Sequence, residues 1–369
     1  MKIAAAMRDT FSGSRLQKIL PYFQSWATVS YVMAGLATGQ SVHNLIRTVA
    51  PSREQWRTQT KMNPYYFRAM SENLATSIRR QMAGEQDVVL MFEALYSPGL
   101  GTRRLTPYVI YDDCTTAAAL ERWPDWVPAT ARTAEYHQLL TEYYQGAARI
   151  LTSNELTRRS LIEDYGAAPD KVVRLGQGCD WGRGGSSRSS VVDGQILFVG
   201  FEFERKGGRT LLEAFREVKQ RVPNATLKLV GPKVNVTDPG VTVIRPGKDK
   251  EALRRLYEQA SVFVLPSYFD PMPNAAMEAM ALGVPTVVAD GCGTVEILTD
   301  GKDGLVVPSG DAAVLANRLT RLLLDADYRA AIGAAGAETI RQLTWERVAD
   351  GARSALEDVV SEFRASPAR

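Results

Sequence analysis

The sequence contains little cysteine and almost no histidine. Its three cysteines, Cys114, Cys179 and Cys292, are isolated from one another and odd in number. This pattern argues against a disulfide framework and against a zinc cluster, and it fits a reducing compartment. The two histidines, His43 and His137, cannot build a metal cluster and have no nucleophile partner beside them. We therefore expect no metal site.

Long apolar runs are also missing. No stretch reaches the roughly 18 apolar residues that a membrane-spanning helix needs. Charges at Lys2, Arg8 and Asp9 interrupt the N-terminus where a secretory signal would need a continuous apolar core. The net charge of +3 is too small to indicate a nucleic-acid binder. These absences predict a cytoplasmic protein with no nucleic-acid partner.

Two common nucleotide-binding motifs are absent as well. No Gly-x-Gly-x-x-Gly follows a predicted strand, and no Gly-x4-Gly-Lys-Ser/Thr occurs. The sequence therefore gives no support to a nicotinamide-dependent dehydrogenase or to a P-loop protein.

Most of the sequence consists of short apolar runs that alternate with longer amphipathic stretches. The 369 residues, 45% of them hydrophobic, are enough for two domains with full cores. Alternation of this kind is typical of α/β units around parallel sheets, whose buried strands are continuous apolar runs. The predicted strands are residues 2–7, 87–92, 108–111, 149–152 and 171–175, then 195–199, 226–230, 241–244, 261–265, 286–289 and 304–307.

A Gly- and Ser-rich segment separates the two halves and predicts a flexible connection. Residues 345–363 form one amphipathic pattern with an apolar face of Val348, Ala352, Ala355, Val359 and Phe363. We predict two Rossmann-like, doubly wound parallel-sheet domains that face each other across a ligand cleft. The predicted segments are a first domain at 1–182, a linker at 183–194, a second domain at 195–345 and a terminal helical segment at 346–369.

The first stretch with candidate chemistry is 196–208. A predicted strand ends at Gly200, and Arg205 and Lys206 lie in the loop before a helical pattern. Two adjacent cations at the carboxyl end of a strand, followed by glycines, suit a phosphate or a diphosphate. A solvated basic turn is the alternative interpretation.

The second stretch follows the strand predicted at 261–265. A loop with two prolines leads into a helix that begins near Pro273 or Asn274. The free amides and the positive dipole end of that helix would form an anion site. Asp270 in the loop and Glu278 inside the helix could accept hydrogen bonds from sugar hydroxyls. Capping by Asp270 and simple helix-face polarity at Glu278 are the alternatives.

Together these stretches resemble the retaining, family-4 glycosyltransferases of GT-B fold. That family has Gly-Arg-x4-Lys-Gly after a strand, and later a Glu-x7-Glu pair that continues as Glu-Ala-Met-Ala-x-Gly-x-Pro. Here residues 200–207 and the pair Asp270 and Glu278 have those spacings, and residues 278–285 match outright. The resemblance covers residues 150–350 well and the N-terminal part only in outline.

The resemblance implies a role for each matching residue. Lys206, helped by Arg205, would neutralise the departing diphosphate of a nucleotide sugar. Backbone amides of Asn274 and Ala275 would bind the same phosphates. Glu278 would hold the ribose, and Asp270 would hold hydroxyls of the transferred sugar. Further donor-site residues are Gly200, Met272, Pro273 and, in the loop after the first strand, Gly13, for which a plain turn is an equal alternative.

Three departures from the family pattern stand out. Phe201 replaces the usual arginine, and Arg205 is the obvious substitute. The first carboxylate of the pair is Asp270, one methylene shorter than glutamate. The histidine that many members have after a first-domain strand is absent, and Asp112 or Asp113 could orient a sugar or acceptor hydroxyl there. Strand-end turn chemistry explains those two aspartates equally well.

The implied activity is transfer of a sugar from a nucleoside-diphosphate sugar to a hydroxyl acceptor, with retention of configuration. The acceptor would be a glycan, a lipid-linked saccharide or a natural product, and the reaction would need neither metal nor bound cofactor. The terminal helix would cross back to the first domain. Two alternatives remain, a non-catalytic GT-B partner of another glycosyltransferase and a GT-B sugar-nucleotide epimerase.

A basic and aromatic stretch at 41–85 could touch anionic lipid at the inner face of the membrane. A solvated helix face is the simpler interpretation, so peripheral membrane contact is not favoured.

Overall fold

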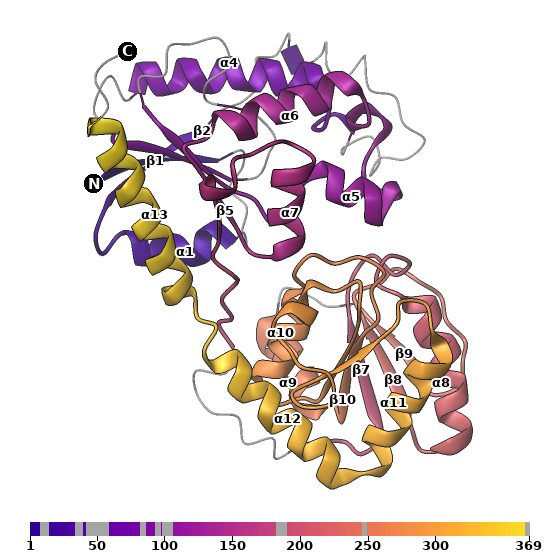
Figure 1. The fold of residues 1–369 in the computed structure, drawn as a ribbon. Helices are drawn as coiled ribbons and strands as arrows, with labels where there is room; N and C mark the ends of the chain where they lie inside the picture. Colours follow the sequence, from indigo (N-terminus) through magenta and orange to yellow (C-terminus); the bar gives the residue numbers. More distant parts are fainter. Residues whose placement is uncertain are drawn as a thin grey trace. The chain divides into compact units, whose positions relative to one another are not determined.

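The computed structural model describes residues 1–7, 15–33, 40–41, 59–81, 86–92, 97, 106–181, 190–245 and 249–365. The chain divides into two compact units, Met1–Gly176 with Trp345–Arg369, and Gln177–Thr344 (Figure 1). Each unit has its own parallel sheet and its own apolar core.

The boundary lies at Gly176, earlier than the predicted 182, because the next residues pack within the second unit. The Cys179 N–H donates to the Leu343 carbonyl at 2.9 Å, and the Gln177 amide donates to the side-chain oxygen of Asn274 at 2.6 Å. At the other end of the predicted linker, the Val192 N–H donates to the Gln259 carbonyl at 2.9 Å.

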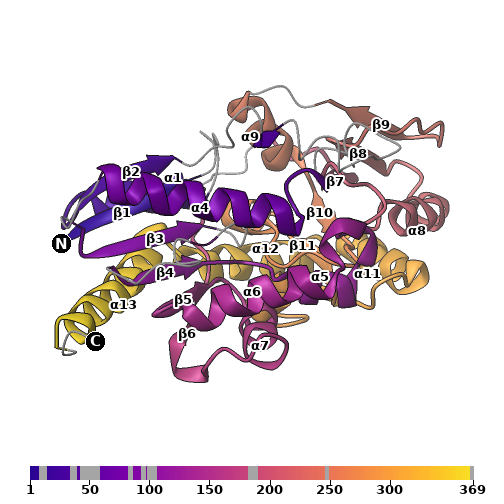
Figure 2. The ribbon, with the colours of Figure 1, turned by 90° about the horizontal axis from the view of Figure 1, so that it is seen from above.

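The first unit is built on a six-stranded parallel sheet. From edge to edge it contains β2 (Thr28–Met33), β1 (Lys2–Met7), β3 (Val88–Phe92), β4 (Tyr108–Tyr111), β5 (Arg149–Thr152) and β6 (Val172–Arg174) (Figure 2). Helices α1 (Arg15–Phe23) and α13 (Trp345–Ala365) share one apolar core with the strands. The other helices are α4 (Pro64–Gln81), α5 (Thr116–Arg122), α6 (Ala134–Gly146) and α7 (Glu155–Glu163), with short turns at Pro124–Trp126, Ala129–Ala131 and Pro169–Lys171.

One strand of this sheet was not predicted. β2 pairs with β1 at the sheet edge, and Tyr31 in its middle is 48% exposed. An edge strand with a solvated face lacks the continuous apolar run by which buried parallel strands are found, so its sequence gave too weak a signal. The predicted strand at 171–175 is shorter than expected because a 3₁₀ turn occupies Pro169–Lys171.

Helix α13 buries most of its predicted apolar face, including Val348, Ala352 and Val359. Phe363 was also expected on that face, but it is 42% exposed because the last residues of the helix, 361–365, all lie beyond the core. Near the helix end, Arg364 pairs with Asp87 at 2.6 Å.

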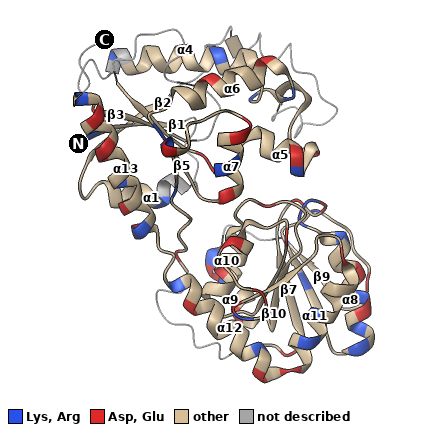
Figure 3. Cartoon of the chain, in the orientation of Figure 1, with Lys and Arg blue, Asp and Glu red and all other residues tan. Residues whose placement is uncertain are grey.

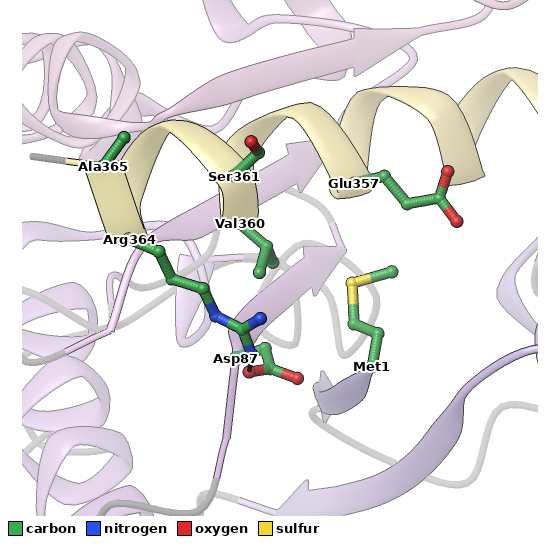
Figure 4. Close-up of a pocket in the computed structure, with 7 residues that line it drawn as sticks. All are labelled: Met1, Asp87, Glu357, Val360, Ser361, Arg364 and Ala365. Carbon is green, nitrogen blue, oxygen red and sulfur yellow. Dashed lines mark hydrogen bonds and ion pairs between the residues drawn. The ribbon is translucent and has the colours of Figure 1, made fainter.

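A pocket lies beside this end of α13 (Figure 4). Asp87 accepts from the Lys2 N–H at 2.8 Å as well as from Arg364, and these two contacts lower the pKa of its carboxyl group. The pocket is at the amino ends of β1 and β3, whereas the predicted chemistry is at carboxyl ends. Its lining is Met1, Asp87, Glu357, Val360, Ser361, Arg364 and Ala365.

The second unit repeats the same architecture. Its parallel sheet contains β12 (Leu305–Val307), β11 (Thr286–Ala289), β10 (Val262–Leu265), β7 (Gln195–Val199), β8 (Thr226–Val230) and β9 (Val241–Ile244), in that order. The helices are α8 (Gly208–Arg221), α9 (Lys250–Gln259), α10 (Asn274–Ala281), α11 (Ala312–Leu324) and α12 (Ala326–Arg341), with a 3₁₀ turn at Gly293–Glu296.

The strand order of the second unit reverses between β7 and β10. From β7 the chain adds β8 and β9 on one side, and then β10, β11 and β12 on the other. In open α/β sheets such a reversal leaves a crevice at the carboxyl ends of the two strands, where ligands bind. The two stretches singled out in the sequence follow β7 and β10.

Candidate active site

The reversal point brings the two predicted loops together. β7 and β10 pair in parallel, with Ile196 opposite Val262, so their carboxyl ends lie at the same edge of the sheet. The loop after β7 carries Arg205 and Lys206, and the loop after β10 carries Asp270 and leads into α10. The structure therefore joins residues that are 64 positions apart in the chain.

The contact between these loops is an ion pair. The Lys206 ammonium donates to Oδ2 of Asp270 at 2.8 Å, and the two side chains are only 15% and 12% exposed. Gly200 makes room for it, because a Cβ at that position would overlap the aliphatic stem of Lys206. Gly207 has φ +71°, and a Cβ there would overlap the Pro266 carbonyl oxygen at the end of β10. Both glycines thus permit the close approach that forms the pair.

Arg205 is buried next to this pair and is not a solvated surface cation. Its guanidinium donates to the Glu202 carboxylate, with Nε at 3.0 Å, and to the Phe269 carbonyl. The Asp270 carboxylate is 3.9 Å away. Two cations thus face two carboxylates, and the cluster is electrically balanced. Phe201, at the position of the family's arginine, is 72% exposed and adds no charge.

The backbone of Asp270 is held from both sides by the segment that follows β11. Its N–H donates to the Gly291 carbonyl at 2.9 Å, and its carbonyl accepts from the Gly293 N–H at 2.8 Å. Cys292 lies between these two glycines, and its thiol is buried. Burial, and then the nearby Asp270 charge, raise the pKa of that thiol to about 12. The carboxylate position is therefore set by a third strand end as well as by Lys206.

Helix α10 begins at Asn274, as predicted, directly after this loop. Pro273 occupies the N-cap position and supplies no side-chain cap to the first amides. Met272 and Pro273 are buried, whereas Asn274 is exposed and Ala275 partly exposed. The positive end of the helix dipole is thus placed at the same strand end as Lys206.

Glu278, one turn into α10, has a partner that the sequence did not indicate. The hydroxyl of Tyr257, on α9, donates to Oε2 of Glu278 at 3.0 Å. The Tyr257 ring is fully buried, and Trp181 packs edge-on against it at 5.4 Å between ring centroids. Burial, followed by the charge of Glu278, raises the pKa of Tyr257 well above its usual value, so the hydroxyl keeps its proton. In the sequence, Tyr257 is one more apolar position of an amphipathic helix.

The two aspartates that follow β4 in the first unit have different surroundings. Asp112 is buried, and its carboxylate accepts from the Tyr144 hydroxyl at 2.5 Å and from the Cys114 N–H at 3.2 Å. Burial and the Asp112 charge raise the pKa of Tyr144. The carboxylate of Asp112 is thus part of the turn and of the aromatic core.

Asp113 is held through its backbone instead. Its carbonyl accepts from the Asn154 amide at 2.8 Å and from the Thr157 hydroxyl at 2.7 Å, both at the start of α7. Its side chain is partly exposed at the carboxyl end of β4. Of the two aspartates, Asp113 is therefore the better placed to meet a ligand.

Several predictions lie outside the described residues. These include the loop with Gly13, residues 183–189 of the linker predicted at 183–194, and residues 42–58 and 82–85 of the basic and aromatic stretch at 41–85. Within the described ranges, no group of three His, Cys, Asp or Glu side chains could hold a metal ion. No helix there is long and apolar enough to cross a membrane. Figure 3 shows Lys and Arg interspersed with Asp and Glu on the helices of both units.

Comparison with solved structures agrees with the architecture. A sucrose-phosphate synthase from Thermosynechococcus elongatus superposes with a TM-score of 0.68 at 17% identity, covering 99% of this chain and 100% of that one. A UDP-forming α,α-trehalose-phosphate synthase from Burkholderia vietnamiensis gives 0.71 at 12% identity, covering 99% of both chains. The chain has the GT-B architecture, built from two Rossmann-like units.

Sequence comparison shows which proteins the chain resembles. Residues 193–325, which lie in the second unit, match the family model for glycosyl transferases group 1. The chain is 28% identical over 232 residues to a D-inositol 3-phosphate glycosyltransferase of Corynebacterium aurimucosum, and 29% identical over 238 residues to that of Frankia alni. The matched segments cover 55% and 57% of this chain and 55% and 58% of the relatives. The chain thus spans little more than half the length of these relatives.

Proposed function

We propose that the protein is a retaining hexosyltransferase that moves a sugar from a nucleoside-diphosphate sugar to a hydroxyl group. One observation carries this proposal: the Lys206–Asp270 pair lies at the carboxyl ends of β7 and β10, beside the start of α10. A cation, a helix dipole and a carboxylate at one strand end suit a ligand with an anionic half and a polyhydroxyl half.

Lys206 would bind the diphosphate and at the same time keep its ion pair with Asp270. A lysine ammonium has three N–H donors, and Asp270 occupies one of them. The amides of Asn274 and Ala275 would add neutral donors to the same phosphates. Because these groups can balance the growing charge of the leaving group, we propose that the reaction needs no metal ion and no bound cofactor.

Asp270 would accept hydrogen bonds from the transferred sugar, and Glu278 from the ribose. Arg205 would assist Lys206 in balancing the charge of the diphosphate. Its guanidinium donates to the Phe269 carbonyl and lies 3.9 Å from the Asp270 carboxylate. Gly200, Met272 and Pro273 would shape the donor site. In the first unit, Asp113 would orient the acceptor hydroxyl.

The reaction would be a front-face displacement. The bond between the anomeric carbon and the phosphate oxygen breaks, and the acceptor oxygen bonds to the same face of that carbon. The departing phosphate oxygen takes the acceptor's proton, so configuration is retained. The protein then contributes orientation and stabilisation of the leaving charge.

The names of the relatives suggest which substrates to assay first. They are D-inositol 3-phosphate glycosyltransferases, and the structural neighbours include sucrose-phosphate and UDP-forming trehalose-phosphate synthases. These names support a uridine nucleotide as donor and a small phosphorylated polyol or sugar as acceptor. Lipid-linked saccharides form the second group to assay.

The proposal is tested by thermal unfolding of the full chain with UDP, GDP, ADP and dTDP and their hexose conjugates. A ligand at 100 times its Kd stabilises the folded state by about 2.7 kcal/mol, and a domain of this size shifts by about 2 °C or more per kcal/mol. We expect a shift of about 5 °C with one base, followed by turnover of its sugar conjugate. No shift with any nucleotide at millimolar concentration would instead support the non-catalytic partner.

A further inference from the structure

The hydrogen bond between Tyr257 and Glu278 connects two helices of the second unit. Tyr257 lies near the end of α9, Glu278 lies on α10, and 21 positions separate them. The tyrosine hydroxyl donates and the carboxylate accepts, because the raised pKa keeps Tyr257 protonated.

Packing fixes the position of the Tyr257 hydroxyl. The ring is fully buried between Trp181, at 5.4 Å and nearly perpendicular, and Phe263, at 5.7 Å. A tyrosine has only two side-chain torsions, so a packed ring holds its oxygen at one place. Glu278 is partly exposed and its side chain has three torsions, so it gains order from this contact.

We propose that Tyr257 is a positioning residue that acts through Glu278 on the ribose of the bound nucleotide. The inference rests on the proposed function, which assigns the ribose to Glu278. A carboxylate offers about four lone-pair sites. Tyr257 occupies one of them on Oε2, and the adjacent hydroxyls at ribose C2′ and C3′ bind to other sites of a carboxylate whose orientation is already set.

A purely structural role for Tyr257 makes a different prediction. If the bond to Glu278 only satisfied a buried hydroxyl, its loss would affect all nucleotides alike. If it positions Glu278, its loss affects only ligands whose ribose hydroxyls bind Glu278. The comparison of ribonucleotides with deoxyribonucleotides therefore separates the two roles.

The experiment measures Kd by calorimetry for the nucleoside diphosphate selected by the thermal panel and for its 2′-deoxy and 3′-deoxy forms. The proteins are the wild type, Tyr257→Phe, Glu278→Gln and the double variant. Tyr108→Phe is the matched control, because it deletes a buried tyrosine hydroxyl in the first unit that donates to the Tyr143 carbonyl at 2.6 Å.

We expect the wild type to prefer the ribonucleotide by about tenfold or more, as charge-assisted hydrogen bonds are lost in the deoxy forms. Tyr257→Phe should weaken ribonucleotide binding about 3- to 10-fold and leave deoxynucleotide binding within about twofold. The double variant should match Glu278→Gln alone, because the two residues act in series. Tyr108→Phe should keep the wild-type preference.

An unchanged ribose preference in Tyr257→Phe, or an equal loss for all three ligands, would overturn the role of Tyr257. A wild type that binds nucleotide without any ribose preference would overturn the role of Glu278 while leaving the donor site in place. A wild type that binds no nucleotide would overturn the proposed function itself. If Tyr257→Phe does not fold, Tyr257→Met provides a second variant without the hydroxyl, with the same expected ratios.

Discussion

Removal of the Lys206 ammonium is the most direct perturbation of the site. Lys206→Met keeps the aliphatic stem that crosses Gly200 and deletes only the charge that donates to Asp270 at 2.8 Å. The variant therefore tests the cation and leaves the packing of the loop in place.

The distances in the structure give the loss of stability expected for Lys206→Met. At an effective dielectric constant of 20, the attraction of Asp270 to Lys206 at 2.8 Å is about 6 kcal/mol, and that to Arg205 at 3.9 Å is about 4 kcal/mol, both before desolvation. Arg205 thus retains roughly two fifths of the summed gross attraction after Lys206 is lost. Breaking a buried pair costs about 3–5 kcal/mol when the remaining charge has no other partner. We expect a smaller loss here, about 1–3 kcal/mol, so the variant should fold.

We expect Lys206→Met to lower catalysis more than it lowers stability. One preorganised group that stabilises developing charge contributes about 2.7–4 kcal/mol, which corresponds to a 10²- to 10³-fold loss of kcat. Turnover of the donor sugar nucleotide is measured together with chemical denaturation. Lys250→Met, an exposed lysine of the same unit, serves as control and should change neither quantity.

The outcomes separate the two roles of the residue. A Lys206→Met variant that loses stability but keeps wild-type turnover would make the ion pair purely structural. A variant with unchanged turnover and unchanged stability would refute the whole assignment of this strand end as the active site.

Two further predictions concern the supports of the site. Gly207→Ala should destabilise the second unit by roughly 3 kcal/mol, from left-handed strain and overlap with the Pro266 carbonyl. Gly301→Ala, also at positive φ but in open space, should lose only about 1 kcal/mol in the same denaturation assay. Because the Cys292 thiol has its pKa raised to about 12, it stays protonated in the folded chain while the unfolded chain releases the proton above about pH 9. Stability should therefore be intact below pH 9 and fall by up to about 1.4 kcal/mol per pH unit from there to pH 12. Cys292→Ala should reduce that slope, and an equal slope in both proteins would contradict the assignment.

Much of the fold could be predicted because buried parallel strands have a recognisable sequence pattern. They have no polar face, so each is a continuous apolar run between amphipathic stretches. The predictions for β4, β5, β7 and β11 were confirmed at both ends. β2 was missed because an edge strand is solvated on one side, as the exposed Tyr31 shows.

Part of the candidate site could also be predicted, since Lys206 and Asp270 each lie in a loop that follows a predicted strand. Only the structure shows that these two strands are neighbours and that the two side chains form an ion pair. The sequence could not tell that Arg205 turns inward to Glu202 and to the Phe269 carbonyl. The direction of a side chain depends on which neighbour offers it a partner, and the partner at Phe269 is 64 residues away.

The sequence by itself determined the two α/β units, the strand-end loops and the residue types of the candidate site. These follow from local patterns, because periodicity and spacing are properties of short segments. Only the tertiary structure decided that Tyr257 holds Glu278, and that Asp112 belongs to the aromatic core while Asp113 is partly exposed. Those assignments depend on contacts between segments 21 and 32 positions apart, and no local pattern specifies which buried hydroxyl meets which carboxylate.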